Sequence, residues 1–338
     1  LIYRISMLDL VEGGAPWSEI VALAKAVEAA GASLINTGVG WHEARIPTVA
    51  SVVPHAAFSW VTRKLKCEVG VPLITSNRIN MPQVAEAVLA RGDADMVSMA
   101  RPMLADANLV LKAKEGRANE INTCIACNQA CLDHIFSGKL CSCLVNPLAC
   151  HETTLTLSPA SCPKRIAVVG AGPAGMAAAV TAAERGHRVV LFEAAAEIGG
   201  QINVAKRVPG KSDFAETLRY FRNRLDKVGV EVRLNTRAEA GSLEGFDAVL
   251  LATGVVPRVP DFPGIDHPKV VGYLDVLMQR KPIGSSVAVI GAGGIGFDVA
   301  EFLTHPDQAE DPIASYQREW GIDPGFAHPG GLQPVAGP

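Results

Sequence analysis

The stretch CIACNQACLDHIFSGKLCSC, residues 124–143, holds five of the chain's eight cysteines and separates two different strand–helix patterns. Its first three cysteines follow a C-x2-C-x3-C spacing, so their sulfurs can converge on one small object. A fourth sulfur comes from Cys141 or Cys143, and spacing alone does not choose between them. Four thiolates are the ligand set of an iron–sulfur cluster or a structural zinc ion. Zinc ribbons usually pair two C-x2-C knuckles and only one is present, so the spacing favours iron–sulfur over zinc or over buried cysteines without a ligand.

Length and composition indicate a globular protein of two or three domains, with 338 residues, 49% hydrophobic and 19% charged. The net charge of −3 gives no electrostatic reason to bind nucleic acid or an anionic membrane. Residues 166–183 are uncharged and long enough to raise the question of a membrane span, but the glycines and Pro173 identify a strand, a turn and a helix. No export signal follows Leu1, so we expect a cytoplasmic protein, whose reducing environment suits thiol ligands.

Residues 1–114 alternate short apolar strands with amphipathic helices, which predicts parallel βαβ units. Four units of this kind make half of a (β/α)8 barrel, in which chemistry takes place where the strands end. The expected strands are LIYRISM (1–7), SLINTGV (33–39), VPLITSN (71–77) and DMVSMA (95–100), and the expected helices are 17–31 and 81–92.

Polar residues follow each of these strands. They are Asn36, Thr37, His42, Glu43, Arg45, Ser76, Asn77, Arg78 and Arg101. Each could be a local cap, but polar groups after every strand favour an anionic ligand over the barrel mouth. His42 could be only a solvated side chain. It follows Gly38 and Gly40, which let the loop approach a ligand, and histidine can hand on a proton near neutral pH.

A dinucleotide-binding pattern begins at Lys164. A buried strand leads into G-x-G-x-x-G at residues 170–175, a helix follows, and a second strand ends at Glu193. The glycines allow a tight turn and a close approach to a pyrophosphate, the helix N-terminus stabilises its charge, and Glu193 can accept hydrogen bonds from a ribose. The full strand–turn–helix–strand context makes this a strong signal.

A second G-x-G-x-x-G lies in SVAVIGAGGIGFDVAEFL, residues 286–303, and predicts a second dinucleotide site. No clear strand follows it, so we expect this second domain to be incomplete.

The order of these parts resembles the bacterial NADPH-dependent 2,4-dienoyl-CoA reductases, iron–sulfur flavoproteins of the old yellow enzyme superfamily. The stretches that carry the resemblance are GWHEARIPT (40–48), INTCIACNQACLDHIF (121–136), CLVNP (143–147), VVGAGPAGMA (168–177), EIGGQIN (197–203) and LLATGVVPRVP (250–260). The resemblance implies an α/β protein with four parts. They are the C-terminal half of an FMN-binding TIM barrel (1–115), an iron–sulfur segment and linker (116–160), a Rossmann-like FAD-binding domain (161–285) and a truncated NAD(P)H-binding domain (286–338).

The resemblance also implies roles for individual residues. The [4Fe–4S] ligands are Cys124, Cys127, Cys131 and Cys143, which leaves Cys141 out. The FMN contacts are Arg4, Arg78, Ala100 and Arg101. The catalytic residue is His42, and the acyl-CoA contacts are Glu43, Ala44, Arg45 and Ile46. The FAD contacts are Gly170, Ala171, Gly172, Ala174, Gly175, Glu193, Gly200, Gln201 and Lys206. The NADPH turn is Gly291, Gly293 and Gly296.

The implied activity is reduction of 2,4-dienoyl-CoA in unsaturated fatty acid β-oxidation, with NADPH electrons passing through FAD, the cluster and FMN. The partners are these two small molecules, with no nucleic acid and no membrane. The family's tyrosine proton donor and first four barrel strands would precede Leu1, so we expect a fragment lacking both ends. One alternative is a related iron–sulfur flavoprotein, either an amine dehydrogenase or another enoate/NADH:flavin oxidoreductase. Amine dehydrogenases tether FMN through a barrel cysteine that Cys67 is not placed to supply. The other alternative is a non-catalytic zinc- and nucleotide-binding module.

Overall fold

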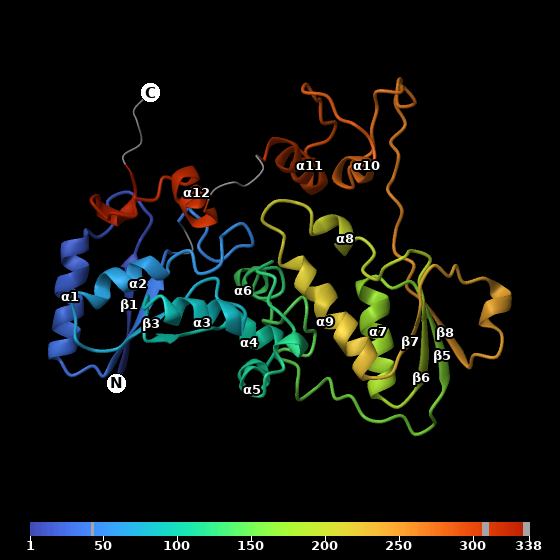
Figure 1. The fold of residues 1–338 in the computed structure, drawn as a ribbon, viewed down its shortest axis with the longest axis horizontal. Coiled ribbons are helices and arrows are strands. Elements are labelled where there is room, and N and C mark those ends of the chain that lie inside the picture. The colour runs from blue at the N-terminus through green and yellow to red at the C-terminus, as the bar shows by residue number, and fades with distance from the viewer. Residues whose placement is uncertain (42–43, 306–310, 334–338) are drawn as a thin grey trace. The chain divides into compact units, whose positions relative to one another are not determined.

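The computed structural model describes residues 1–41, 44–305 and 311–333 (Figure 1). These residues form two compact units. Unit 1 contains residues 1–150 together with the C-terminal segment, residues 311–333. Unit 2 contains residues 151–305. Within the described residues, no helix has the length and apolar character needed to cross a membrane.

Unit 1 is built on a four-stranded parallel sheet whose strands lie in chain order, which confirms the predicted βα units. The strands are β1 (Ile2–Leu8), β2 (Leu34–Val39), β3 (Leu73–Thr75) and β4 (Met96–Val97). The helices that connect or follow them are α1 (Trp17–Ala29), α2 (Ser59–Lys66), α3 (Pro82–Ala90), α4 (Arg101–Ala105) and α5 (Leu109–Lys114). Parallel strands joined in this order bring their carboxyl ends to one edge. The predicted polar residues Ser76, Asn77, Arg78 and Arg101 follow β3 and β4 there. Asn36 and Thr37 instead lie inside β2, where Thr37 is buried.

The cysteine-containing part of unit 1 has little regular structure. Its elements are a 3-10 turn η1 (Ala118–Glu120) and the short helix α6 (Leu132–Phe136). Since so few backbone hydrogen bonds lie in helices or sheets here, this stretch depends on side-chain contacts, or on a ligand, to hold its shape.

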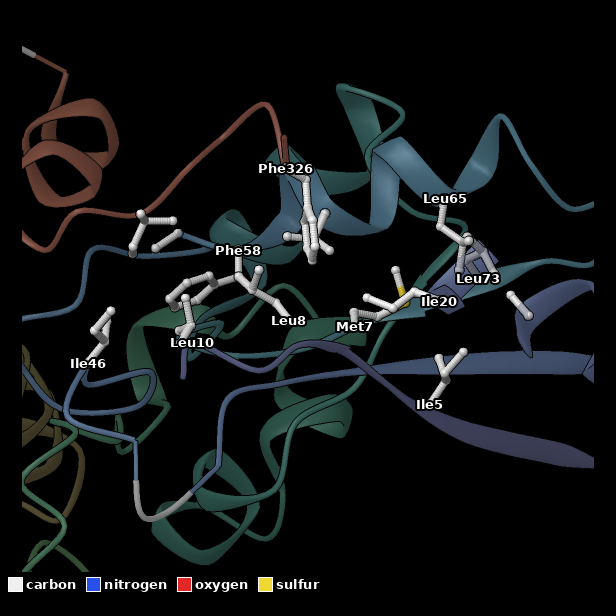
Figure 2. Close-up of a cluster of buried hydrophobic side chains, with 14 of the residues drawn as sticks. Ile5, Met7, Leu8, Leu10, Ile20, Ile46, Phe58, Leu65, Leu73 and Phe326 are labelled. Atoms are coloured by element: carbon white, nitrogen blue, oxygen red, sulfur yellow. The ribbon is translucent and has the colours of Figure 1, made fainter. Parts of the chain in front are cut away.

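The core of unit 1 joins segments far apart in the sequence. Figure 2 shows Leu8 near Phe326, which comes from the C-terminal segment, and the same core includes Ile46 and Phe58. The segment contains α12 (Pro312–Glu319) and the 3-10 turn η3 (Pro329–Gly331), and its Tyr316 and Ile322 are also buried in this core. The prediction that residues 286–338 form one nicotinamide domain is therefore wrong for residues 311–333. Their aromatic and aliphatic side chains are buried against unit 1 instead.

Unit 2 contains the predicted dinucleotide fold. Its parallel sheet has the order β7-β6-β5-β8, with the glycine turn after the central strand β5. The strands are β5 (Arg165–Val169), β6 (Arg188–Phe192), β7 (Glu231–Arg233) and β8 (Ala248–Leu251). The other elements are α7 (Pro173–Glu184), α8 (Ile202–Ala205), α9 (Phe214–Lys227), η2 (Ala240–Leu243), α10 (Tyr273–Leu277) and α11 (Gly294–Thr304).

The second glycine fingerprint forms only in part. Helix α11 follows the turn, and Gly296 lies so close to the carbonyl oxygen of Gly291 that a Cβ would overlap it. The apolar stretch before the turn pairs with no other strand among the described residues, and Val287 and Ile290 stay exposed. A strand needs a neighbour to complete its hydrogen bonds, and without one this stretch remains irregular.

Candidate functional site

Four cysteines line one small cavity in unit 1. They are Cys124, Cys127, Cys131 and Cys143, and Arg101, Leu104, Asn128 and Val145 complete most of the wall. Cys141 is not in this wall. The structure therefore brings together the four cysteines that the resemblance names, whereas the spacing left Cys141 and Cys143 equivalent.

Unusual backbone conformations occur inside the cysteine motif. Ala126 and Asn128 have φ values of 54° and 60°, a left-handed conformation that side chains other than glycine rarely adopt. The side-chain amide of Asn80 donates to the carbonyl oxygen of Cys124 at 2.9 Å, and the Arg101 guanidinium donates to the Asn128 side chain. Local strain held by hydrogen bonds from other elements is typical of a binding site.

Burial and neighbouring thiols favour the protonated form of three cysteines in the cavity wall. Burial raises the pKa of Cys124 and Cys127, and it raises the pKa of Cys143 to about 11. Neighbouring thiols add to each of these rises, whereas the positive charges of Arg101 and Arg78 oppose the rise for Cys124. Thiols with a raised pKa, such as those of Cys124, Cys127 and Cys143, become thiolates more readily when positive charge is bound beside them, as in a metal or iron–sulfur site. Among the described residues, no three His, Cys, Asp or Glu side chains are grouped closely enough to hold a single metal ion.

The four residues predicted to contact FMN lie at two places. Arg78 follows β3 and Ala100 precedes Arg101 at the start of α4, so three of them lie at the carboxyl ends of β3 and β4. Arg78 is 7% exposed, and its Nε donates to the carbonyl oxygen of Val53 at 2.7 Å. Arg4 lies in the middle of β1 instead, with its Nη1 3.5 Å from Oδ1 of Asn36. The arginines after β3 and β4 are thus close to the cysteine cavity, which Arg101 itself lines.

The predicted substrate loop is described only in part, because His42 and Glu43 lie outside the described residues. Ala44 is half-buried and Arg45 is exposed. Ile46 is 8% exposed and packs in the core of unit 1. The side chain of Ile46 thus anchors the end of the loop.

Hydrogen bonds also hold the end of this loop. The Tyr316 hydroxyl of the C-terminal segment donates to the carbonyl oxygen of Pro47, and Asn77 Nδ2 donates to the carbonyl oxygen of Thr48 at 3.2 Å. Burial raises the pKa of Tyr316, so its hydroxyl remains a donor.

The three glycines of the first turn in unit 2 have different surroundings. Gly170 has φ of 101°, and a Cβ there would overlap the carbonyl oxygen of Ala252. A Cβ at Gly175 would overlap the carbonyl oxygen of Gly170. A Cβ at Gly172 would meet no atom within 4 Å, so open space lies where the pyrophosphate would approach. The two outer glycines are thus required by packing and the middle one is left for a ligand.

Glu193 and the EIGGQIN stretch lie against this turn. One oxygen of the Glu193 carboxylate accepts from the backbone N–H of Ala171 at 2.8 Å, and the other accepts from that of Ala195 at 2.9 Å. Gly199 N–H donates to the carbonyl oxygen of Ala171 at 2.8 Å, and a Cβ on Gly200 would lie 3.2 Å from the Cα of Gly172.

The remaining predicted FAD contacts are held by neighbouring residues. Gln201 donates to the carbonyl oxygen of Val255 at 3.1 Å, and Lys206 donates to the side chain of Asn203 at 2.8 Å. Ala174 lies in the first turn of α7. Glu193, Gly199 and Gly200 thus contact the glycine turn, an arrangement compatible with a dinucleotide there.

Sequence reasoning missed several residues that support these sites. Asn128 lies inside the cysteine motif, and its left-handed backbone is a conformation for which asparagine is enriched, so a signal existed. Asn80 and Tyr316 act across long separations, and no local pattern points to them.

Comparison with known proteins covers most of the chain. Residues 1–120 match the NADH:flavin oxidoreductase / NADH oxidase family, and residues 164–310 match the pyridine nucleotide-disulphide oxidoreductase family. A metal reductase of Desulforamulus reducens is 38% identical over 309 residues, which are 90% of this chain and 46% of that protein. A cinnamate reductase of Clostridium sporogenes is 34% identical over 302 residues, 87% of this chain and 44% of that protein.

Among solved structures, a 2-naphthoyl-CoA reductase in complex with 2-naphthoyl-CoA has a TM-score of 0.86 and 36% identity. The match covers 90% of this chain and 47% of that one. The chain thus spans about half the length of the relatives it matches.

Proposed function

Because residues 1–120 belong to the NADH:flavin oxidoreductase / NADH oxidase family and residues 164–310 to the pyridine nucleotide-disulphide oxidoreductase family, we propose that this chain is part of a flavin-dependent reductase of conjugated acyl-CoA esters. The two families indicate FMN, FAD and NAD(P)H as cofactors. We propose NADPH as the electron donor, 2,4-dienoyl-CoA as the acceptor, and a [4Fe–4S] cluster on Cys124, Cys127, Cys131 and Cys143.

The cysteine cavity carries this proposal. When bound, the flavins exchange electron pairs as hydride and the cluster passes single electrons, which separates the two substrates in space. The four thiols line the same cavity as Arg101, which starts a helix at the carboxyl end of β4. Arg101 can therefore hold the phosphate of FMN or its reduced ring while its positive charge favours thiolates in the cavity wall.

The substrate class rests on the loop that begins at Gly40. We propose that His42 hands a proton to the acyl chain, and that the residues after it orient the thioester. Tyr316 and Asn77 fix the far end of this loop through Pro47 and Thr48.

Two of the similar proteins are named for cinnamate and for 2-naphthoyl-CoA, both of which place a conjugated system next to a carbonyl. A dienoyl thioester has the same electronic arrangement.

The glycine turn in unit 2 would bind FAD. Glu193 is held beside the turn by the N–H groups of Ala171 and Ala195, where it can also accept hydrogen bonds from the adenosine ribose. The open space over Gly172 leaves the pyrophosphate room to contact the backbone.

The test is an anaerobic assay of the complete reductase that contains this chain, with iron, sulfide and extracted flavins measured on the same sample. We expect four irons per chain and NADPH oxidation that depends on 2,4-dienoyl-CoA. Turnover with cinnamate as fast as with 2,4-dienoyl-CoA, or faster, would show that the proposed substrate is wrong. Oxidation of a methylated amine without reduction of dienoyl-CoA would show the same. A colourless protein that binds zinc would overturn the proposal itself.

An amine dehydrogenase has less support from the structure. Cys67, which follows α2 as its last capping residue, is exposed and precedes β3 by several residues. It lies on the connection leading into the strand, away from the strand's carboxyl end, where a flavin over the barrel would be tethered.

A further inference from the structure

Two cysteines outside the cavity lie beside each other in unit 1. The Ser142–Ala149 hydrogen bond places Cys141 and Cys150 on neighbouring runs of chain. Burial raises the pKa of the Cys141 thiol, and the nearby Cys150 thiol adds to the rise. Neither residue lines the cavity formed by the other four cysteines. None of the eight cysteines, all of which are in the described part of the chain, is in a disulfide.

The backbone brings these two cysteines together. An antiparallel bridge between Cys143 and Asn146 reverses the chain, and the N–H of Ala149 donates to the carbonyl oxygen of Asn146 at 3.1 Å. The Ser142 hydroxyl then donates to the carbonyl oxygen of Ala149 at 3.1 Å. Since Cys141 precedes Ser142 and Cys150 follows Ala149, the hydrogen bond holds the two thiols on adjacent runs of chain.

The pair is accessible from solvent. Cys150 is exposed and Cys141 is partly buried, so a small oxidant reaches Cys150 first. Such a pair, with one accessible thiol and a second thiol in contact with it, has the arrangement of a redox-sensing disulfide in a reducing compartment.

We propose that Cys141 and Cys150 form a reversible disulfide when the protein meets a peroxide. The Cys150 sulfur attacks one peroxide oxygen, the O–O bond breaks, and water leaves as the sulfur becomes a sulfenic acid. The Cys141 sulfur then attacks the sulfenic sulfur and displaces a second water. The two thiols thus lose two electrons and two protons to the peroxide, and a dithiol reductant returns both.

The disulfide would close a loop that contains Cys143. Residues 141–150 would be pinned at both ends, and the closed loop has fewer open conformations in which Cys143 leaves the cavity. If the proposed cluster is present, the oxidised pair would hold its fourth ligand, Cys143, in place during oxidative stress. Only this consequence rests on the proposed function.

The direct test maps the disulfide in the full chain. The protein is purified without oxygen, exposed to one equivalent of hydrogen peroxide, blocked with N-ethylmaleimide under denaturing conditions and digested with chymotrypsin. Cleavage after Leu144 and Leu148 separates Cys150 from the other two cysteines of the loop, and fragmentation of the linked peptides identifies the partner.

We expect a Cys141–Cys150 link that dithiothreitol reverses. Cys141→Ser and Cys150→Ser should each abolish it, while Cys162→Ser, a control at an exposed cysteine downstream, should retain it. A link from Cys150 to Cys143 or Cys162 would overturn the proposal, and so would sulfinic acid at Cys150 without any link.

Iron release to a chelator separates this inference from the proposed function. We expect oxidised wild type to release iron more slowly than oxidised Cys150→Ser, and the two reduced proteins to release it alike. Equal release after oxidation would refute the protective consequence. A chain that forms the link but holds no iron would refute the cluster and leave the disulfide established.

Discussion

At the scale of single residues, the choice between Cys141 and Cys143 shows what three dimensions add to spacing. Both were equivalent in the sequence, because an extended stretch places residues two apart on the same face. In the structure the bridge to Asn146 begins at Cys143, and only Cys143 joins the cavity wall. The turn from Cys143 to Asn146 has no signature in the C-S-C triplet itself.

We therefore expect Cys143→Ser to lower iron content strongly and Cys141→Ser to leave it unchanged. Serine removes the thiolate at either position while keeping nearly the same volume, so the pair is matched. Iron and sulfide analysis of the two purified variants provides the measurement. Loss of iron in Cys141→Ser but not in Cys143→Ser would show that Cys141, and not Cys143, is the fourth ligand.

Glu193 allows a second test at this scale. Replacing it by Gln keeps its size but removes the charge with which it accepts from Ala171 and Ala195. A hydrogen bond to a charged group contributes about 1.5–3 kcal/mol, so we expect FAD to bind at least about tenfold more weakly. Dialysis followed by flavin extraction measures this. Full FAD retention would show that the ribose is held elsewhere.

At the scale of elements, the first glycine turn was predictable almost completely. The strand, turn, helix and second strand formed where the sequence placed them, because each has its own local signal. The stretch before the second turn has a similar pattern, but no strand forms there among the described residues. Periodicity identifies a segment able to form a strand, and pairing with a neighbour decides whether it does.

The glycines of the first turn provide a matched pair of substitutions. Gly175→Ala places a methyl group on the carbonyl oxygen of Gly170, so we expect unit 2 to lose its packing and its cooperative unfolding transition. Gly172→Ala meets no atom and has an ordinary φ of −71°, so the unit should fold normally and lose only FAD. Circular dichroism and flavin content distinguish the two outcomes. Normal FAD binding by Gly172→Ala would place the pyrophosphate away from this turn.

At the scale of the whole molecule, the C-terminal segment was the largest failure of sequence reasoning. Residues 311–333 follow the second glycine turn in the chain and were assigned to its domain, yet they complete the core of unit 1. Their apolar residues are few and irregularly spaced, so no periodicity reveals a partner. Gly331 lies against Leu8 so closely that a Cβ would overlap its side chain, which only the folded structure can show.

We expect Phe326→Ala to destabilise unit 1 by about 3–5 kcal/mol, the usual cost of emptying a buried phenylalanine site. Phe326 is 5% exposed and packs 5.3 Å from the ring of Trp17, centroid to centroid. Phe136→Ala in the same unit is the control, because Phe136 is 66% exposed and its truncation should cost much less. Chemical denaturation of both variants measures the difference. Similar losses would show that the segment is not part of the core.

Acid should loosen the same segment. Burial alone would raise the pKa of Asp323, but hydrogen bonds from His328 and from the N–H groups of Ala327 and Gly325 outweigh burial and lower it. The unfolded state then binds more protons near the ordinary carboxyl pKa, so stability is lost as the pH falls below about 3.9. Asp323→Asn should remove this part of the acid dependence, as followed by tryptophan fluorescence. An unchanged acid profile would assign the effect to other carboxylates.

The return of residues 311–333 to unit 1 also sets an order of events during synthesis. Residues 1–150 leave the ribosome first, but Tyr316, Ile322 and Phe326 arrive only after all of unit 2 has been made. At about 5–20 residues per second, the first sheet waits on the order of ten seconds or more with part of its apolar surface uncovered. Unit 2, whose core residues lie between 151 and 305, can fold in that interval. Unit 1 therefore begins to be made before unit 2 but completes its core only after residues 311–333 have been made.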